Sequence, residues 1–124
     1  MTSQGSPYAR FRRALANGNP SLAWAAAAEL PAIDLADALA LCLVAAGDPE
    51  RYGRAAARWH ARYCTELRGV TLAESQLVLA ALQALPQGLG AGAAAETLAH
   101  LAEERGLGEV ARLLERWPTS ASRP

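Results

Sequence analysis

Signals that start and stop helices recur along the whole sequence. Ser or Asx followed by Pro, a pair typical of a helix N-terminus, stands at 6–7, 19–20 and 48–49. Residues 34–37 and 71–74 carry capping-box patterns, the first in a shorter form. Gly or Pro stands where each segment has to end. These signals predict seven helices, which begin near 7, 20, 35, 49, 72, 93 and 107 and stop at or before 18, 31, 47, 69, 86, 106 and 118.

The residue types agree with an all-helical chain. Ala occurs 30 times and Leu 19 times, whereas Ile occurs once, Val four times and Phe once. So few β-branched and aromatic residues exclude an all-β domain, and a hydrophobic fraction of 52% excludes a disordered chain. We therefore expect an all-α fold of six or seven helices in antiparallel hairpins, as a compact bundle or a short α-solenoid-like array.

The distribution of apolar residues predicts how these helices pack. The segments 35–46 and 72–85 are apolar nearly all round, so we expect them at the centre. The cap signals recur at offsets of 29 and 37 residues, which leaves open both a helical-hairpin repeat and a coincidence of common signals. We expect a flexible N-terminus over 1–6, a single helical domain over 7–118 and a flexible tail over 119–124.

Arginine is the most informative residue type for function. The chain has 12 Arg, no Lys and 12 acidic residues, so its net charge is zero. The charge is nevertheless uneven, because residues 1–70 hold eight Arg and six acids and residues 71–124 hold four Arg and six acids. Four arginines in the fourth predicted helix share one arc about 80° wide. They are Arg51, Arg54, Arg58 and Arg62, and Arg10, Arg12 and Arg13 form a second cluster on the first helix.

This arginine face suggests a binding surface for an anion. The guanidinium fork matches carboxylate and phosphate groups, so we expect a non-enzymatic protein-interaction module whose partner is acidic. Its contact residues would be Arg51, Arg54, Arg58, Arg62, Arg10 and Arg13. One alternative is nucleic-acid binding by the same face, against which stand the neutral chain and the lack of a helix-turn-helix spacing. Others are a small-molecule pocket between helices lined by Trp or Tyr, and a merely solvated helix face.

Enzymatic and metal chemistry find no support in the residue pattern. His60 and Cys64 are four residues apart and could supply two zinc ligands, but no second ligand pair accompanies them. The glycines at 88–92 follow no strand and precede no Lys-Ser/Thr pair, so they indicate an interhelical loop and not a phosphate loop. We expect no catalytic residue, metal or cofactor. Trp24, Trp59 and Trp117 are expected to pack in the core, with Trp117 the most exposed.

The remaining expectations concern cysteines and location. In a hairpin that turns near Gly47, Cys42 and Cys64 would differ in height by roughly 18 Å, whereas a disulfide needs Cα atoms within about 7 Å. Both cysteines should therefore be reduced. The longest uncharged apolar stretch, residues 38–47, is too short for a membrane span of about 20 residues, and the N-terminus lacks the features of a signal peptide. We expect a cytoplasmic protein, with homo-oligomerisation left open.

Overall fold

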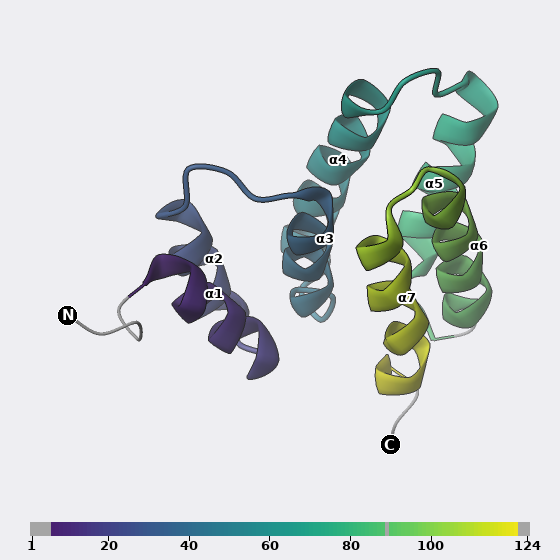
Figure 1. The fold of residues 1–124 in the computed structure, drawn as a ribbon. Coiled ribbons are helices and arrows are strands. Elements are labelled where there is room, and N and C mark those ends of the chain that lie inside the picture. The colour runs from purple at the N-terminus through teal and green to yellow at the C-terminus, as the bar shows by residue number, and fades with distance from the viewer. Residues whose placement is uncertain (1–5, 89, 122–124) are drawn as a thin grey trace.

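The computed structural model describes residues 6–88 and 90–121. These residues form seven helices and no strand (Figure 1). The predicted all-α class is confirmed. Each helix packs against the next one along the chain, and α7 also packs on α3. Of the ends predicted as flexible, 1–6 and 119–124, residues 1–5 and 122–124 lie outside the described residues, whereas Ser6 is the N-cap of α1 and residues 119–121 belong to the last helix. The helices are α1 (Pro7–Ala16), α2 (Pro20–Ala28), α3 (Leu35–Val44), α4 (Pro49–Glu66), α5 (Leu72–Ala84), α6 (Ala91–Glu104) and α7 (Gly108–Ala121).

Side-chain caps start the first five helices. The side chain of each N-cap residue accepts a hydrogen bond from the backbone amide three residues later, as the sequence patterns predicted. Gly18 adopts a φ of 68°, a left-handed conformation that lets the chain turn sharply after α1. Among the described residues, none of the helices is both long enough and apolar enough to cross a membrane. The cap residues are Ser6, Asn19, Asp34, Asp48 and Thr71.

Two predicted boundaries were wrong. Helix α6 begins at Ala91 and not at Ala93, because Gly90 takes a left-handed conformation with a φ of 89° and ends the preceding loop early. Helix α7 continues through Pro118 to Ala121. A proline fixes φ at a value that a helix also uses and removes one backbone hydrogen bond, so it disfavours the continuation of a helix without forbidding it. A proline therefore predicts a helix end less strictly than a glycine with positive φ.

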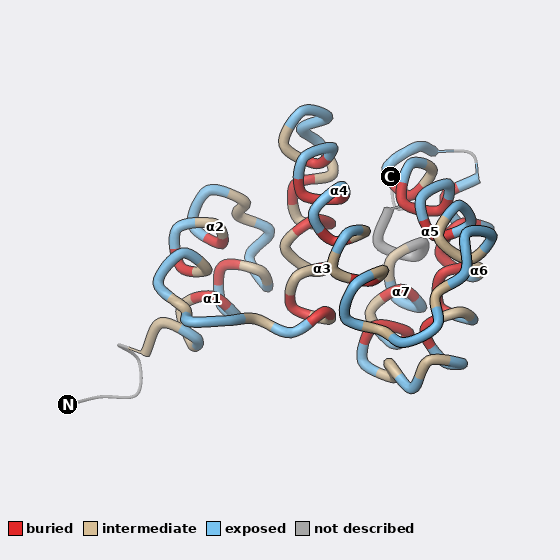
Figure 2. Tube along the Cα trace, turned by 90° about the horizontal axis from the view of Figure 1, so that it is seen from above, coloured by how far each residue is buried: buried red, intermediate tan, exposed pale blue. Residues whose placement is uncertain are grey.

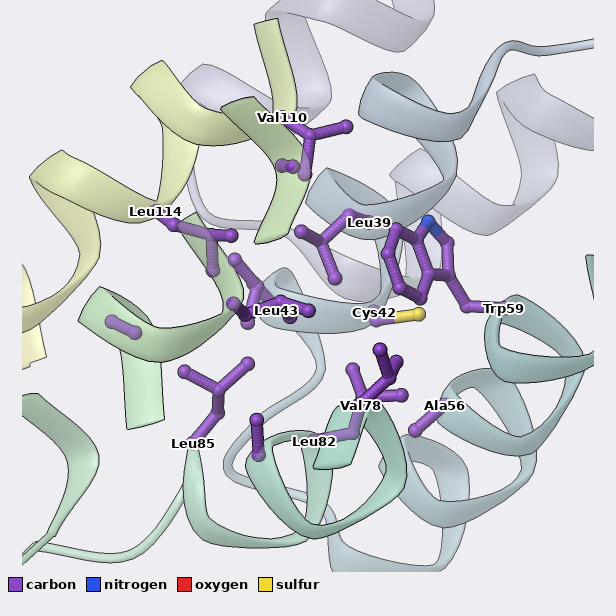
Figure 3. Close-up of a cluster of buried hydrophobic side chains, with 14 of the residues drawn as sticks. Leu39, Cys42, Leu43, Ala56, Trp59, Val78, Leu82, Leu85, Val110 and Leu114 are labelled. Carbon is purple, nitrogen blue, oxygen red and sulfur yellow. The ribbon is translucent and has the colours of Figure 1, made fainter. Parts of the chain in front are cut away.

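Helix α3 lies at the centre, as predicted, and contacts α1, α2, α4 and α7. Figure 3 shows Leu39 and Leu43 of α3 among side chains from α4, α5 and α7. Trp59 is fully buried there, and its Nε1 donates a hydrogen bond to the Leu35 carbonyl oxygen at 2.8 Å. Of the other two tryptophans, both half-buried, Trp117 donates to the Leu85 carbonyl oxygen at 3.1 Å.

Helix α5 does not lie at the centre, which corrects the prediction from its composition. Its contacts are with α4 and α6 only, so a single face is covered. Val78 and Leu82 are buried on that face, whereas Leu72, Leu77 and Leu79 are 75%, 46% and 40% exposed. An all-round apolar sequence therefore does not reveal how many neighbours a helix has.

The α1–α2 hairpin stands at one side of the molecule, next to α3 and α4 (Figures 1 and 2). Its buried residues, such as Phe11 and Ala23, lie outside the main core cluster. Asp37 of α3 is only 8% exposed and accepts hydrogen bonds from Tyr8 Oη and Arg12 Nη1, each at 3.0 Å. The sequence pattern assigned Asp37 to the cap of α3, whereas its carboxylate binds the hairpin to α3.

A second polar contact joins α4, α5 and α6. The Glu74 carboxylate accepts a hydrogen bond from Tyr63 Oη at 2.7 Å and forms an ion pair with Arg105, whose Nε lies 2.9 Å away. Arg105 also donates to the carbonyl oxygens of Arg68 and Gly69, so it holds the α4–α5 turn. One of the two hydrogen bonds of the predicted capping box is present, because the Glu74 amide donates to the Thr71 hydroxyl. The Glu74 carboxylate, which would make the other, binds Arg105 and Tyr63.

Replacement of Asp37 by Ala should loosen the α1–α2 hairpin selectively. The change removes the buried carboxylate that Tyr8 and Arg12 bind; since both donors are exposed and can turn to water, the loss in local stability should be about 1 kcal/mol. Hydrogen exchange should accelerate in α1 and α2 but not in α4–α7. Glu29→Ala, which removes only an exposed ion pair with Arg10, should leave exchange near that of the wild type. Equal acceleration throughout the chain would contradict this role of Asp37.

The Glu74 contact should make stability depend on pH. The hydrogen bond from Arg105 is the main reason why the pKa of Glu74 is lowered, and the hydrogen bond from Tyr63 lowers it further. A carboxyl whose pKa is lower in the folded state than its unfolded value, about 4.3, stabilises the fold above that value. This stabilisation disappears as the pH falls through the folded-state pKa.

Urea unfolding at pH 7, 5 and 3 checks this. The Glu74→Gln variant should unfold more easily than the wild type at pH 7, and the difference should shrink towards pH 3. Glu96→Gln, at an exposed position of α6, serves as the control and should show little difference at any pH. A Glu74→Gln effect that stays constant with pH would exclude a contribution from the Glu74 charge.

Candidate functional site

The α4 arginines lie along the side of the helix that meets α2 and the 29–34 connection. The Arg51 guanidinium stands 5.4 Å from the centre of the Trp24 ring, a cation–π contact. Arg62 Nη2 donates to the Ile33 carbonyl oxygen at 2.9 Å, and Arg62 Nε pairs with Glu66 at 2.6 Å. Two of the four arginines predicted to bind a partner thus make intramolecular contacts, which help to hold α2 and the connection that follows it.

Arg54 and Arg58 differ from their neighbours on α4. Both are exposed, and their guanidinium groups form no hydrogen bond or ion pair with the residues that the structure describes. Since they are four residues apart on one long helix, they project from adjacent turns. They are the members of the predicted arginine face whose charges remain available to an outside anion.

Arg10 and Arg13 line a separate hollow, between α1 and α2. Leu22 and Ala25 contribute to its wall, and Glu29 pairs with Arg10 at 2.6 Å. The sequence grouped these two arginines with the α4 face. The structure places them in different surroundings, where an acidic residue of the same chain already partners Arg10.

An apolar hollow of about 190 Å³ opens beside Arg58, at the junction of α2, α3 and α4. Ala38 and Ala55 leave this space because their side chains end at Cβ, and Trp24 of α2 forms another part of its wall. Figure 3 shows Cys42 and Trp59, two of its lining residues, side by side. The lining consists of Trp24, Ile33, Ala38, Leu41, Cys42, Ala55 and Trp59, together with Arg58 and Arg62.

The electrostatics of the hollow follow from this lining. Burial raises the pKa of the Cys42 thiol to about 12, and the positive charge of Arg58 opposes part of that rise. The thiol is therefore neutral at physiological pH, and the charged lining side chains are both arginines. The hollow can hold an apolar group, and the neighbouring guanidinium groups can donate hydrogen bonds to a carboxylate.

The structure also links the His60 and Cys64 pair to a residue that sequence reasoning missed. His60 Nε2 lies 3.0 Å from the Ser75 carbonyl oxygen and 3.1 Å from its hydroxyl, and Cys64 Sγ lies 3.6 Å from His60 Nε2. No group of three or more His, Cys, Asp or Glu side chains that could hold a metal occurs in the described part of the chain. The signal that could have found Ser75 is its position in the first turn of α5, just across the short α4–α5 connection.

A larger groove of about 610 Å³ runs between α4 and α5. Tyr52, Gly53 and Ala57 line it on the α4 side, and Leu79 and Leu82 on the α5 side. Its lining contains no charged residue. The small-molecule hypothesis expects an interhelical pocket lined by Trp or Tyr, and this groove with Tyr52 fits it, as does the smaller hollow with Trp24 and Trp59.

The two cysteines should differ in reactivity. Both are free thiols, as predicted, but Cys42 is 1% exposed with a pKa of about 12, whereas Cys64 is half-buried. Because thiolate is the reactive form, native protein at pH 8 should release one equivalent of chromophore from an aromatic disulfide reagent, and two after unfolding. Cys64→Ser should abolish the native reaction. A native reaction that survives in Cys64→Ser would show that Cys42 is accessible.

Comparison with known protein families, with curated proteins and with solved structures found no match for this chain.

Proposed function

We propose that this chain is a non-enzymatic protein-interaction module that binds an acidic surface of its partner through Arg54 and Arg58. The observation that carries the proposal is that these two exposed guanidinium groups have no hydrogen bond or ion pair with the described residues, whereas Arg51 and Arg62 on the same helix make contacts within the chain. Helix α4 is packed on α3 and α5, so the backbone from which both side chains project is fixed. Two guanidinium groups on adjacent turns can bind neighbouring carboxylates.

Nucleic-acid binding by the same face has less support. A protein that follows a phosphate backbone neutralises several phosphates at once, and its affinity depends on their number. Arg51 and Arg62 make intramolecular contacts, and the chain has no net positive charge. Two available arginines match a local acidic cluster better than an extended polyanion.

The groove between α4 and α5 supports a second candidate function, the binding of a small apolar molecule. Its volume of about 610 Å³ and its uncharged lining suit such a ligand. A ligand of this kind should raise the melting temperature of the purified protein, and charge reversal at Arg54 and Arg58 should leave that rise unchanged.

Charge reversal tests the principal proposal. The double variant Arg54→Glu/Arg58→Glu should lose most of the proteins that the wild type captures from a nuclease-treated extract of its native cell. Each charge-assisted hydrogen bond contributes about 1.5–3 kcal/mol, so affinity should fall at least about tenfold. Circular dichroism should show an unchanged fold, because both side chains are exposed.

The chain itself offers a matched control. Arg112 and Arg116 are exposed on α7 with the same four-residue spacing, so Arg112→Glu/Arg116→Glu makes an equal change of charge elsewhere. This control should retain the captured proteins. If both double variants capture them as the wild type does, α4 is not the contact surface. If the wild type captures nucleic acid from an extract that has not been treated with nuclease, and Arg54→Glu/Arg58→Glu does not, the nucleic-acid alternative holds instead.

A further inference from the structure

We infer that the partner segment is an acidic peptide with one bulky apolar side chain, which enters the hollow between α2, α3 and α4 while neighbouring carboxylates pair with Arg54 and Arg58. This inference rests on the proposed function and identifies the kind of partner. Its basis is that one arginine, Arg58, belongs both to the available pair and to the wall of the apolar hollow. A ligand that uses one of these features necessarily comes close to the other.

The volume of the hollow limits the apolar group. An apolar cavity of about 150 Å³ in a protein core accommodates a benzene ring. The hollow measures about 190 Å³, so it suits one large aliphatic or aromatic side chain. Trp24 and Ile33, both half-buried, form part of its wall and offer apolar surface to such a group. A few side chains buried in well-packed pockets carry most of the binding energy of an interface, so one such side chain can contribute substantially.

The charges around the hollow indicate which residues flank the apolar side chain in the partner segment. The charged residues that line the hollow, Arg58 and Arg62, are both positive. Arg62 is already paired with Glu66, but Arg58 has no ion pair within the described chain, and neither has Arg54 one turn away. Adjacent turns of a helix are about 5.4 Å apart, close to the spacing of about 6.6 Å between alternate residues of an extended peptide. Acidic residues at alternate positions next to the apolar side chain would therefore meet both guanidinium groups.

Selection from a random dodecapeptide phage library on the wild-type protein tests this. The selected peptides should combine Asp or Glu with a Leu, Ile, Phe or Trp within about three residues. Synthetic copies labelled with a fluorophore should bind in anisotropy titrations. Replacement of the apolar residue by Ala, or of the acids by Asn and Gln, should each weaken binding at least about tenfold. Since these changes are in the peptide, they cannot disturb the fold of the protein.

Two protein variants locate the binding site. Ala38→Phe places a ring in the hollow and should weaken the selected peptides at least about tenfold, with an unchanged helical circular dichroism spectrum as the check on folding. Arg54→Glu/Arg58→Glu should weaken them similarly, whereas Arg112→Glu/Arg116→Glu should not. If Ala38→Phe does not fold, the titration of the Ala-substituted peptide against the wild type still decides the question.

The outcomes separate this inference from the proposed function. Acidic peptides that lack an apolar residue, or that bind Ala38→Phe as well as the wild type, would overturn the inference and leave the arginine surface standing. Peptides that bind Arg54→Glu/Arg58→Glu with unchanged affinity would overturn both. A library that yields no enriched sequence, or only neutral or basic sequences, would also overturn the inference.

Discussion

The fold depends on covering α3. Its side chains are apolar almost all round, so stable packing requires neighbours on every side, and α1, α2, α4 and α7 supply them. The polar contacts follow from that packing. Trp59 satisfies its buried N–H on the Leu35 carbonyl oxygen, and the buried carboxylate of Asp37 receives Tyr8 and Arg12. The α1–α2 hairpin is thereby attached to the rest of the molecule largely at a single helix.

The arginines of α4 show how one residue type can have two roles on one helix face. Arginine combines an apolar stem with a planar fork, so it can stack on a ring or donate to a carbonyl oxygen as well as bind an anion. Arg51 and Arg62 use these properties within the chain, against Trp24 and Ile33. Between them lies the pair on which the proposed function rests. The separation follows from where α2 and its connection contact α4, at Arg51 through Trp24 and at Arg62 through Ile33.

Much of the fold and less of the candidate site could be predicted from the sequence. Ser6, Asn19 and Thr71 start helices through hydrogen bonds to amides three residues away, so neighbouring residues suffice to predict them. Glu74 fits such a local pattern too, yet its carboxylate binds Arg105, 31 residues later. The arc of arginines on α4 was visible in the spacing. The hollow beside it was not, because its wall comes from segments between residues 24 and 62 that only folding brings together.

The sequence by itself determined where most of the helices begin and end, and which residues share a face. These properties depend on hydrogen bonds and spacings within about four residues. The tertiary structure alone decided that α5 has an exposed apolar face, that Asp37 is buried beneath α1, and that Arg54 and Arg58 on α4 have no ion pair with the described residues. Burial and charge pairing depend on which surfaces meet in space. Identical residue types on one helix can therefore have different partners.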